Sequence, residues 1–458
     1  MAKGPVQNKS SNFAKWVTCI LAASSVSIPA LSYAGSKEVA QRLFDRLNGH
    51  PIALTDPRLA QMIAKIDAGD KLGAAEIATN DDGFYNVTVK KWGATMSNRS
   101  EVALFQDPDR SRAPYFGSLN DFNATIIGVT RDNLDARLLL TGDFIYKADT
   151  SIDKPGAKQP PFLTTADAKT SIHSDHLLNW TNDHYTYIEQ QNVNLREHLV
   201  QTKQLVTTSM YWGYDNNQPP PLVPNPDTAG LLTTRAFTYA HMLNGTNRRW
   251  VEFAFREFTC RPITQWADAH VLDTYVRRDV ERAPAGDVML FKTRCIACHG
   301  ALDGMAGATA HYTWYSPVSG SWVQGGFLVR APGPIPYSAD SNGVFNKANK
   351  NSQNYPSGHV VMDDSWINQA TQNQNVSFGW KGPVSGNGMH SFGQMIANSD
   401  AFPQCMAKRI FTEMCRRAPA ESEAAIVKSL GDQFVSDNYN LRILFERAAI
   451  LPNCLPQQ

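Results

Sequence analysis

The sequence predicts a mainly α-helical fold, and three observations predict it. Apolar residues recur at intervals of three and four along much of the chain, most clearly near both ends. Alternation of apolar and polar residues, which would mark half-buried strands, is weak and confined to short stretches. No β-α-β pattern is evident. We therefore expect a helical N-terminal domain over residues 35–226 and a second helical domain with long loop insertions over residues 227–458.

The composition and net charge of the chain limit the classes of function to be expected. The chain has 458 residues, of which 42% are hydrophobic, enough to bury a sizeable core in two or three domains. The formal net charge is +1, and neither sign of charge runs in blocks. Charge therefore gives no support to nucleic-acid binding or to attachment to an anionic membrane.

The first 34 residues have the pattern of a secretory signal peptide. A lysine-containing start precedes a run of apolar and small residues, and the run ends in Ser32-Tyr33-Ala34, with small residues where a signal peptidase needs them. Serines and Pro29 interrupt the run, so it is a poor permanent membrane span. We expect cleavage after Ala34 and an exported, for example periplasmic, mature protein without a transmembrane span.

The N-terminal domain begins with two amphipathic helices, expected over residues 36–47 and 57–67. Val39, Leu43, Phe44 and Leu47 share one face of the first, and the second repeats the pattern. Further along we expect, in order, a short extended piece, a helix with an Asx-type start, a long helical span broken near residue 194, and a proline-rich connector. These elements cover residues 80–92, 132–140, 174–209 and 216–226.

The second domain is expected to open with helical structure over residues 231–258, broken at residues 244–247. Trp250, Phe253, Ala254 and Phe258 can share one apolar stripe, which favours packing of helix on helix.

The five-residue motif Cys295-Ile296-Ala297-Cys298-His299 carries a specific chemistry. Two cysteines separated by two residues and followed by histidine form the attachment signal of a c-type haem. Within one helical turn both thiols can reach the haem vinyl groups, and the imidazole becomes the proximal iron ligand. The motif therefore predicts one haem c held by Cys295, Cys298 and His299. The alternatives are a redox dithiol, which usually lies near a β-α-β unit, and half of a zinc site, which needs a second Cys/His pair.

The motif should lie on a helix over residues 287–300, with Val288, Met289 and Phe291 facing inward. Gly300, Gly304 and Gly307 are expected to end this helix and to let the backbone lie close to the macrocycle. Residues 308–388 should form a long loop region or a small insertion with hairpins. Helices follow over residues 391–398, from Ser399 or Asp400 to about residue 417, and over residues 421–435 and 440–451.

A haem helix, a loop and C-terminal helices, in this order, are the organisation of a cytochrome c domain, here extended by insertions. The chain resembles a group of large exported bacterial proteins, of planctomycete and proteobacterial type, that end in a cytochrome c-like region. The matching stretches are residues 132–144 (DNLDARLLLTGDF), 230–260 (GLLTTRAFTYAHMLNGTNRRWVEFAFREFTC), 295–308 (CIACHGALDGMAGA) and 391–417 (SFGQMIANSDAFPQCMAKRIFTEMCRR). The resemblance implies an exported haem protein and names no substrate. Many relatives carry Asp-Pro where this chain has Asp303-Gly304.

The sequence offers several candidates for the second axial ligand of the haem iron. Met389 is the preferred distal ligand, because class I cytochromes place a methionine loop before their C-terminal helices. The remaining possibilities are Met362 (with His359 nearby), Met305, His390, His311 and an empty site, and ordinary core packing is an alternative for each methionine.

Other polar residues have weaker functional interpretations. Arg248, Arg249 and Arg330 could pair with haem propionates, with surface salt bridges as the alternative. His173, His176 and His184 are spaced so that metal binding is conceivable, with solvent-exposed histidines as the alternative.

Four cysteines outside the motif, namely Cys260, Cys405, Cys415 and Cys454, remain after removal of the signal. In an oxidising compartment an even number favours two disulfides, with free buried thiols as the alternative. Cys405 and Cys415 should share a helix about 15 Å apart, too far to bridge each other. We prefer the pairs Cys260–Cys405 and Cys415–Cys454, because the last two cysteines both close helices, but Cys260–Cys415 with Cys405–Cys454 remains open.

These features together predict an exported monohaem cytochrome that passes single electrons between a redox enzyme and a carrier. Its redox partner cannot be named from the sequence, and no nucleic-acid partner is expected. A peroxidase- or oxygenase-like haem enzyme is the first alternative, because residues 35–287 are more than a carrier needs. An envelope binding or scaffold protein with a structural haem is the second.

Overall fold

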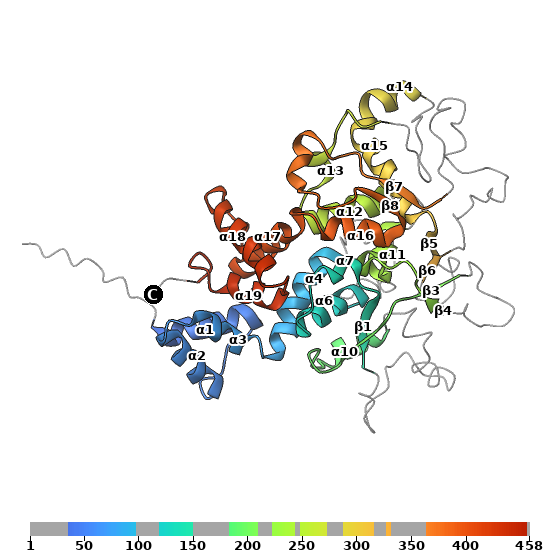
Figure 1. The fold of residues 1–458 in the computed structure, drawn as a ribbon. Helices are drawn as coiled ribbons and strands as arrows, with labels where there is room; N and C mark the ends of the chain where they lie inside the picture. The colour runs from blue at the N-terminus through green and yellow to red at the C-terminus, as the bar shows by residue number, and fades with distance from the viewer. Residues whose placement is uncertain are drawn as a thin grey trace, which may run out of the picture.

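A computed structural model describes most of the chain, and the described part is mainly α-helical, as predicted (Figure 1). The described residues are 35–97, 119–149, 183–208, 222–242, 248–272, 287–315, 327–330 and 363–455. Within these ranges, no helix is both long and apolar enough to cross a bilayer. The expected signal peptide lies outside them.

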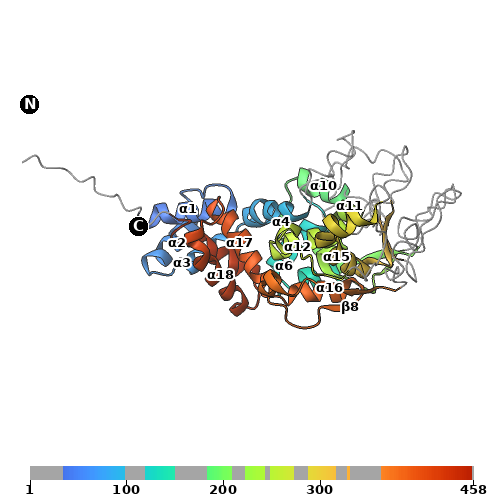
Figure 2. The same ribbon diagram turned by 90° about the horizontal axis from the view of Figure 1, so that it is seen from above.

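The two ends of the chain meet in one group of helices, which we call the terminal lobe. It consists of α1 (Ser36–Asn48), α2 (Pro57–Asp67), α3 (Lys71–Ala78), α17 (Ala401–Cys415), α18 (Ala424–Ser436) and α19 (Leu441–Ala449). The N-terminal and C-terminal helices lie side by side in both views (Figures 1 and 2), and α19 packs on α1 and α3.

The predicted helices of the terminal lobe are confirmed. Val39, Leu43, Phe44 and Leu47 of α1 are all buried, so the predicted apolar face is the face that packs. In α17, Pro403 lies in the first turn, and the Ser399 hydroxyl accepts the N–H of Phe402 at 3.3 Å. Local periodicity was sufficient here because each apolar face packs on other helices.

The extended piece predicted over residues 80–92 is wrong. The chain there forms a π-helical segment, Phe84–Val89, that continues into α4 (Lys90–Ser97). The rings of Phe84 and Trp92 both meet Phe445 of α19 edge to face, with centroids 5.4 and 5.3 Å apart. A wide helical turn brings both rings to one side, and packing against a distant helix decides the conformation over a weak local alternation.

Two further predictions of helix are wrong in part. Asp132 ends a helix, α6 (Asp121–Arg131), instead of starting one, and α7 covers only Leu138–Thr141. Within residues 174–209 the break near Asn194 is confirmed after α10 (Asp183–Gln190), but strands β2 (Leu199–Lys203) and β3 (Leu205–Thr207) follow it. β2 pairs antiparallel with β1 (Phe144–Ala148), a partner that local periodicity cannot reveal.

A second group of helices and short strands contains the motif, and we call it the motif lobe; α4, α6, α7, α10 and β1–β3 are counted in neither lobe. Its helices are η5 (Gly230–Thr233), α11 (Arg235–Met242), α12 (Arg248–Thr259), α13 (Ile263–Trp266), α14 (Val288–Leu290), η7 (Phe291–Cys295), α15 (Ile296–Met305), η8 (Ala306–Thr309), η10 (Asn373–Phe378) and α16 (Gly388–Ala397). Its strands are β4 (Leu222–Pro224), β5 (Tyr312–Tyr315), β6 (Phe327–Arg330), β7 (Ser365–Ile367) and β8 (Ser385–Asn387).

Of the two alternatives predicted for residues 308–388, the antiparallel pair β5–β6 agrees with the insertion that contains hairpins. These strands join β3 and β4 in a sheet of order β4-β3-β6-β5, which therefore takes strands from both sides of the predicted boundary at residues 226 and 227. One hydrophobic core runs through both lobes. The division into two domains is thus not visible in the packing and stays a prediction.

Candidate functional site

The motif lies where a π-helical turn passes into a regular helix. Cys295 ends η7, and Cys298 and His299 occupy the first turn of α15. At about 100° per residue, these three positions fall on one side of the helix. Both thiols are unpaired, and the two cysteines and His299 are all half-buried.

Of the residues predicted to face inward before the motif, Phe291 is buried as predicted, whereas the prediction for Met289 is wrong. Phe291 is buried, and its ring lies edge-on to the His299 ring with centroids 6.4 Å apart. Met289 is 61% exposed, because α14 projects from the lobe and leaves that side chain uncovered (Figure 1). The side chain of Val288 lies outside what the structure describes.

The glycines after the motif do not end the helix, contrary to the prediction, since α15 continues to Met305. They allow close approach by other parts of the chain. A Cβ at Gly300 would lie 2.6 Å from Val271 Cγ2, and a Cβ at Gly304 would lie 2.8 Å from the Ile367 carbonyl oxygen. Next to this contact, the Asp268 N–H donates to the Ala297 carbonyl at 2.9 Å and fixes a segment against the motif turn.

A buried ion pair fixes α15 against α12. Arg248 Nε and Nη2 donate to the two carboxylate oxygens of Asp303 at 2.6 and 3.0 Å, and Asp303 is fully buried. Arg248 therefore pairs inside the protein, which is neither the surface bridge nor the propionate contact considered from the sequence. Arg330 lies over the Tyr312 ring at 5.9 Å, and its Nε has no hydrogen-bond partner.

A negatively charged side chain acts on the Cys298 thiol. Burial raises the pKa of its thiol, and the negative charge of Glu252 on α12 raises it further. Glu252 is itself held by Arg256 at 2.6 Å and accepts the N–H of Ile263, at the start of α13, at 2.9 Å. A thiol in this environment is mostly protonated at neutral pH.

The predicted distal ligands lie in different environments. Met389 and Met305 are fully buried in the hydrophobic core, which agrees with the core-packing alternative, and Met389 N–H donates to Asp227 Oδ2 at 2.8 Å. The His390 ring bonds the Thr228 carbonyl and Gln394. His311 Nδ1 has no hydrogen-bond partner. Met362 and His359 lie outside the described residues, and Met389 as distal ligand stays a prediction.

The predicted histidine cluster is described only in part, since His173 and His176 lie outside the described residues. Both ring nitrogens of His184 are buried without a hydrogen-bond partner, so this ring is not the solvent-exposed histidine that the alternative assumed. In the described part of the chain, no group of three or more His, Cys, Asp and Glu side chains is arranged to hold a metal ion.

The disulfides follow the preferred pairing. Cys260 is bonded to Cys405 and Cys415 to Cys454, with Cα atoms 5.2 and 4.4 Å apart. Cys405 and Cys415 both lie on α17, as the spacing argument assumed. The described cysteines left unpaired are those of the motif.

Sequence reasoning missed two kinds of buried polar residue in the described structure. Asp121 and Asp227 accept backbone N–H groups at the N-termini of α11 and α16, from positions far away in the chain. His241 is buried with both ring nitrogens unpartnered, inside a stretch that reads as an ordinary apolar helix. Neither kind has a local sequence signal.

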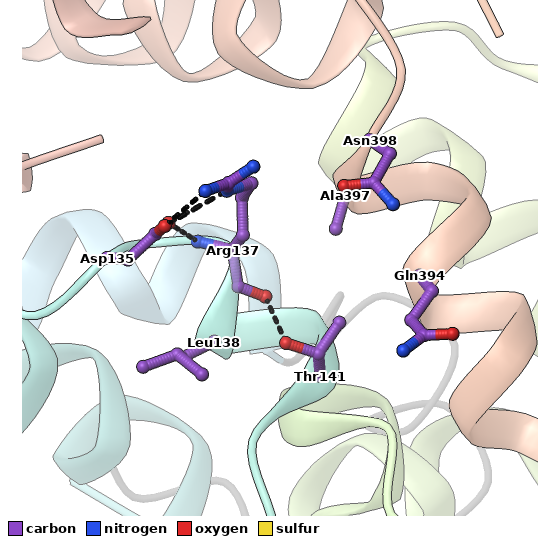
Figure 3. Close-up of a pocket in the computed structure, with 7 residues that line it drawn as sticks. All are labelled: Asp135, Arg137, Leu138, Thr141, Gln394, Ala397 and Asn398. Atoms are coloured by element: carbon purple, nitrogen blue, oxygen red, sulfur yellow. Dashed lines mark hydrogen bonds and ion pairs between the residues drawn. The ribbon is translucent and has the colours of Figure 1, made fainter. Parts of the chain in front are cut away.

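A separate pocket of about 280 Å³ lies between α7 and α16 (Figure 3). Its lining includes the Asp135–Arg137 pair and the amides of Gln394 and Asn398, and Thr141 donates to the Arg137 carbonyl. It contains no residue of the motif.

Comparison with known proteins adds no relative. No family model matches the chain, and no curated protein or solved structure matches it either. The functional argument therefore depends on the residues of the site.

Proposed function

We propose that this chain is an exported monohaem c-type cytochrome that passes single electrons between a redox enzyme and a carrier. One observation supports this most directly. Among the described cysteines, four are joined in disulfides, and the two unpaired ones, Cys295 and Cys298, lie one helical turn apart and directly before His299. Two free thiols and an adjacent imidazole are the donor set that a covalently attached haem requires.

The residues of the site fit a haem c. Cys295 and Cys298 would form the thioethers, and His299 would be the proximal ligand. When bound, the haem supplies a one-electron iron couple. The protein holds the attachment turn in place through the Asp268–Ala297 hydrogen bond, and the Arg248–Asp303 ion pair keeps α15 on α12. The Phe291 ring restricts the orientation of His299.

The environment of Cys298 argues against the dithiol alternative. Cysteine pairs that exchange disulfides work through a thiolate whose pKa is lowered by positive charge or a helix N-terminus. Here burial and Glu252 raise the pKa of Cys298 instead. Haem attachment has no need of a stable thiolate in the folded state.

The first test is covalent retention of haem. The full chain, produced with haem-attachment machinery, should keep one haem after denaturation and show a low-spin reduced c-type spectrum. The Cys295→Ser/Cys298→Ser variant should retain none. The matched control is Cys415→Ala/Cys454→Ala, which also removes two cysteines and should retain the haem. A wild-type protein that releases all its haem, or never carries it, contradicts the proposal.

The same spectra separate electron transfer from catalysis. A carrier should be six-coordinate and unresponsive to carbon monoxide. A five-coordinate, high-spin spectrum that shifts with carbon monoxide or cyanide would favour the haem enzyme instead.

A further inference from the structure

Exposed apolar side chains lie around the motif. Among the described residues, seven large apolar side chains are exposed, and three of them, Leu272, Met289 and Val376, belong to segments that surround the motif turn. Their exposed fractions are 62%, 61% and 63%. Single exposed apolar residues are normal on a protein surface, whereas a group of them around one site marks an interaction surface.

Two of these side chains are next to residues that touch the motif. Leu272 directly follows Val271, whose Cγ2 would lie 2.6 Å from a Cβ on the glycine after the motif. Met289 comes two residues before Phe291, whose ring meets the His299 ring with centroids 6.4 Å apart. Both exposed side chains are therefore within two residues of a contact with the motif turn.

Val376 is one segment further away. It lies on η10, from which the Gln374 side-chain amide donates to the Ala267 carbonyl at 2.7 Å. The N–H of the next residue, Asp268, donates to the Ala297 carbonyl of the motif at 2.9 Å. Two successive hydrogen bonds thus connect η10 to the motif turn.

The exposed charges on the segment that leads into the motif are mainly basic. Lys292 and Arg294 lie on η7, which ends at the first cysteine of the motif, and both are exposed. Asp287 is also exposed but lies further from the motif, where it accepts the Met289 N–H at 2.8 Å. The Asp268 carboxylate, next to the motif turn, is only 6% exposed. The described surface of this segment is therefore positive on balance.

This part of the molecule is open to approach by another protein. Cys295 and Cys298 are half-buried, so the bonds that would hold the haem form near the protein surface. α14 and α15 lie at the end of the molecule away from the terminal lobe (Figure 1). Transient redox complexes bury less than about 1,200 Å² in total, so a few apolar side chains with charges beside them are enough for one.

We propose that a redox partner docks on five side chains around the motif, which we call the motif rim: Leu272, Met289, Lys292, Arg294 and Val376. The partner that fits this surface is an electron-transfer protein whose own redox centre is surrounded by apolar and acidic residues. Opposite charges guide the encounter, and apolar contacts stabilise the complex once it has formed. The proposal rests on the proposed function, because a haem at the motif is what makes the partner a redox protein.

The test uses the full, haem-loaded chain and, as the probe, a flavodoxin, which is an acidic electron-transfer protein. Titration calorimetry measures binding of the two oxidised proteins, and stopped-flow absorbance measures reduction of the haem by the reduced probe. At an ionic strength of about 20 mM, Lys292→Glu/Arg294→Glu should weaken binding and slow reduction about tenfold, and the difference should shrink at about 500 mM.

The matched control for charge is Lys37→Glu/Lys408→Glu, which makes the same change in net charge at exposed positions of the terminal lobe. It should alter the affinity and the rate by less than about twofold. Met289→Ser should weaken binding about threefold at either ionic strength, because it removes apolar contact and no charge. Its control, Leu54→Ser, changes a side chain that is 68% exposed just before α2 and should have no effect.

Two results would overturn the assignment. One is an effect of the Lys292→Glu/Arg294→Glu variant no larger than that of its control. The other is a Met289→Ser variant that binds the probe as tightly as Leu54→Ser does. The haem spectrum of each variant, recorded first, shows that it is folded and loaded. Absence of covalent haem from the wild type is a separate result, seen before any binding is measured, and contradicts the proposed function instead.

Discussion

The terminal lobe and the motif lobe differ in how completely they satisfy their own buried polar groups. In the terminal lobe, Thr79 donates to Glu446 at 2.6 Å, and Arg442 donates to both. Among the described residues of this lobe, Asn48 Oδ1 is the one buried side-chain polar atom without a partner. The motif lobe has several, on Asn225, His241, Trp266, His311, Arg330, Asn375 and Trp380. The proposed function accounts for this difference, because a lobe that holds a haem would leave some polar groups for contacts outside the polypeptide.

The two lobes also differ in what positions their helices. α2 starts at a local signal, Asp56, which accepts the N–H of Arg58 at 2.9 Å. α11 and α16 depend on remote carboxylates, Asp121 and Asp227. The comparison teaches that a helix such as α2 starts at a signal beside it in the sequence, whereas α11 and α16 of the motif lobe are capped only through contacts with distant residues.

The largest expected effect comes from the bridge between the lobes. Cys260–Cys405 joins α12 to α17 across 145 residues, so the chain-entropy model predicts a loss of about 5 kcal/mol of stability in Cys260→Ala/Cys405→Ala. Because one hydrophobic core runs through both lobes, the chain should still unfold in one step, at a lower urea concentration than the wild type, which far-ultraviolet circular dichroism would show.

The control for this bridge is Cys415→Ala/Cys454→Ala, which opens a loop of 39 residues within the terminal lobe. It should cost about 4 kcal/mol, less than the first variant, because the loop it closes is shorter. A loss of stability in the Cys260 variant no larger than in this control would contradict the predicted order. A non-reduced digest containing a Cys260–Cys415 peptide pair would contradict the pairing itself.

The next-largest effects should come from truncating one buried phenylalanine in each lobe. Phe445 in the terminal lobe contacts Phe84 and Trp92, and Phe255 in the motif lobe stacks on Trp266 at 4.7 Å. Each Phe→Ala change should cost about 3–5 kcal/mol in urea unfolding, because both rings are fully buried. Only Phe255→Ala should also alter the haem spectrum, and an identical response from Phe445→Ala would erase the distinction.

A smaller, pH-dependent effect belongs to the terminal lobe. Arg417 and the Ala420 N–H hold the pKa of Glu423 down to about 2, from an ordinary value of 4.5. Because the folded pKa is depressed, the stabilisation is present above about pH 4.5 and is lost as the pH falls toward 2. Glu423→Gln should therefore lower Tm at pH 6 and match the wild type near pH 2. A Tm difference that persists at pH 2 would show that the lost interaction is not ionic.

The smallest effect is expected at the surface. Lys91 of α4 pairs with Glu413 of α17 at 2.9 Å, but the lysine is 67% exposed. Lys91→Ala should change stability by less than about 1 kcal/mol, with the difference shrinking in 1 M salt. A larger, salt-insensitive loss would mean that the methylene chain of Lys91 contributes packing.

Predictions from the sequence were correct where local spacing determines the structure. They were wrong where contacts with distant parts of the chain determine it. The helices of the terminal lobe follow from apolar spacing, and the shared helix of Cys405 and Cys415 follows from their separation. The predictions for residues 80–92 and 199–203 were wrong because Phe445 and β1, respectively, determine the conformation of these segments. The motif could be read because its chemistry lies within five residues. His241 could not, because its distinguishing property is the absence of a hydrogen-bond partner for its ring nitrogens, which only the described structure reveals.

Because the first and last helices of the chain pack together, the terminal lobe can form only after the last helices have been synthesised. Arg46 of α1 donates to the Met414 carbonyl at the end of α17, and Arg442 of α19 donates to Thr79 at 2.9 Å. During synthesis, α1–α3 wait with an uncovered apolar face until the last helices emerge, and contacts of such long range form late. The segment around Cys295 emerges earlier than α17–α19. The proposed function then implies that haem attachment enzymes can meet the motif in a chain whose terminal lobe has not yet closed.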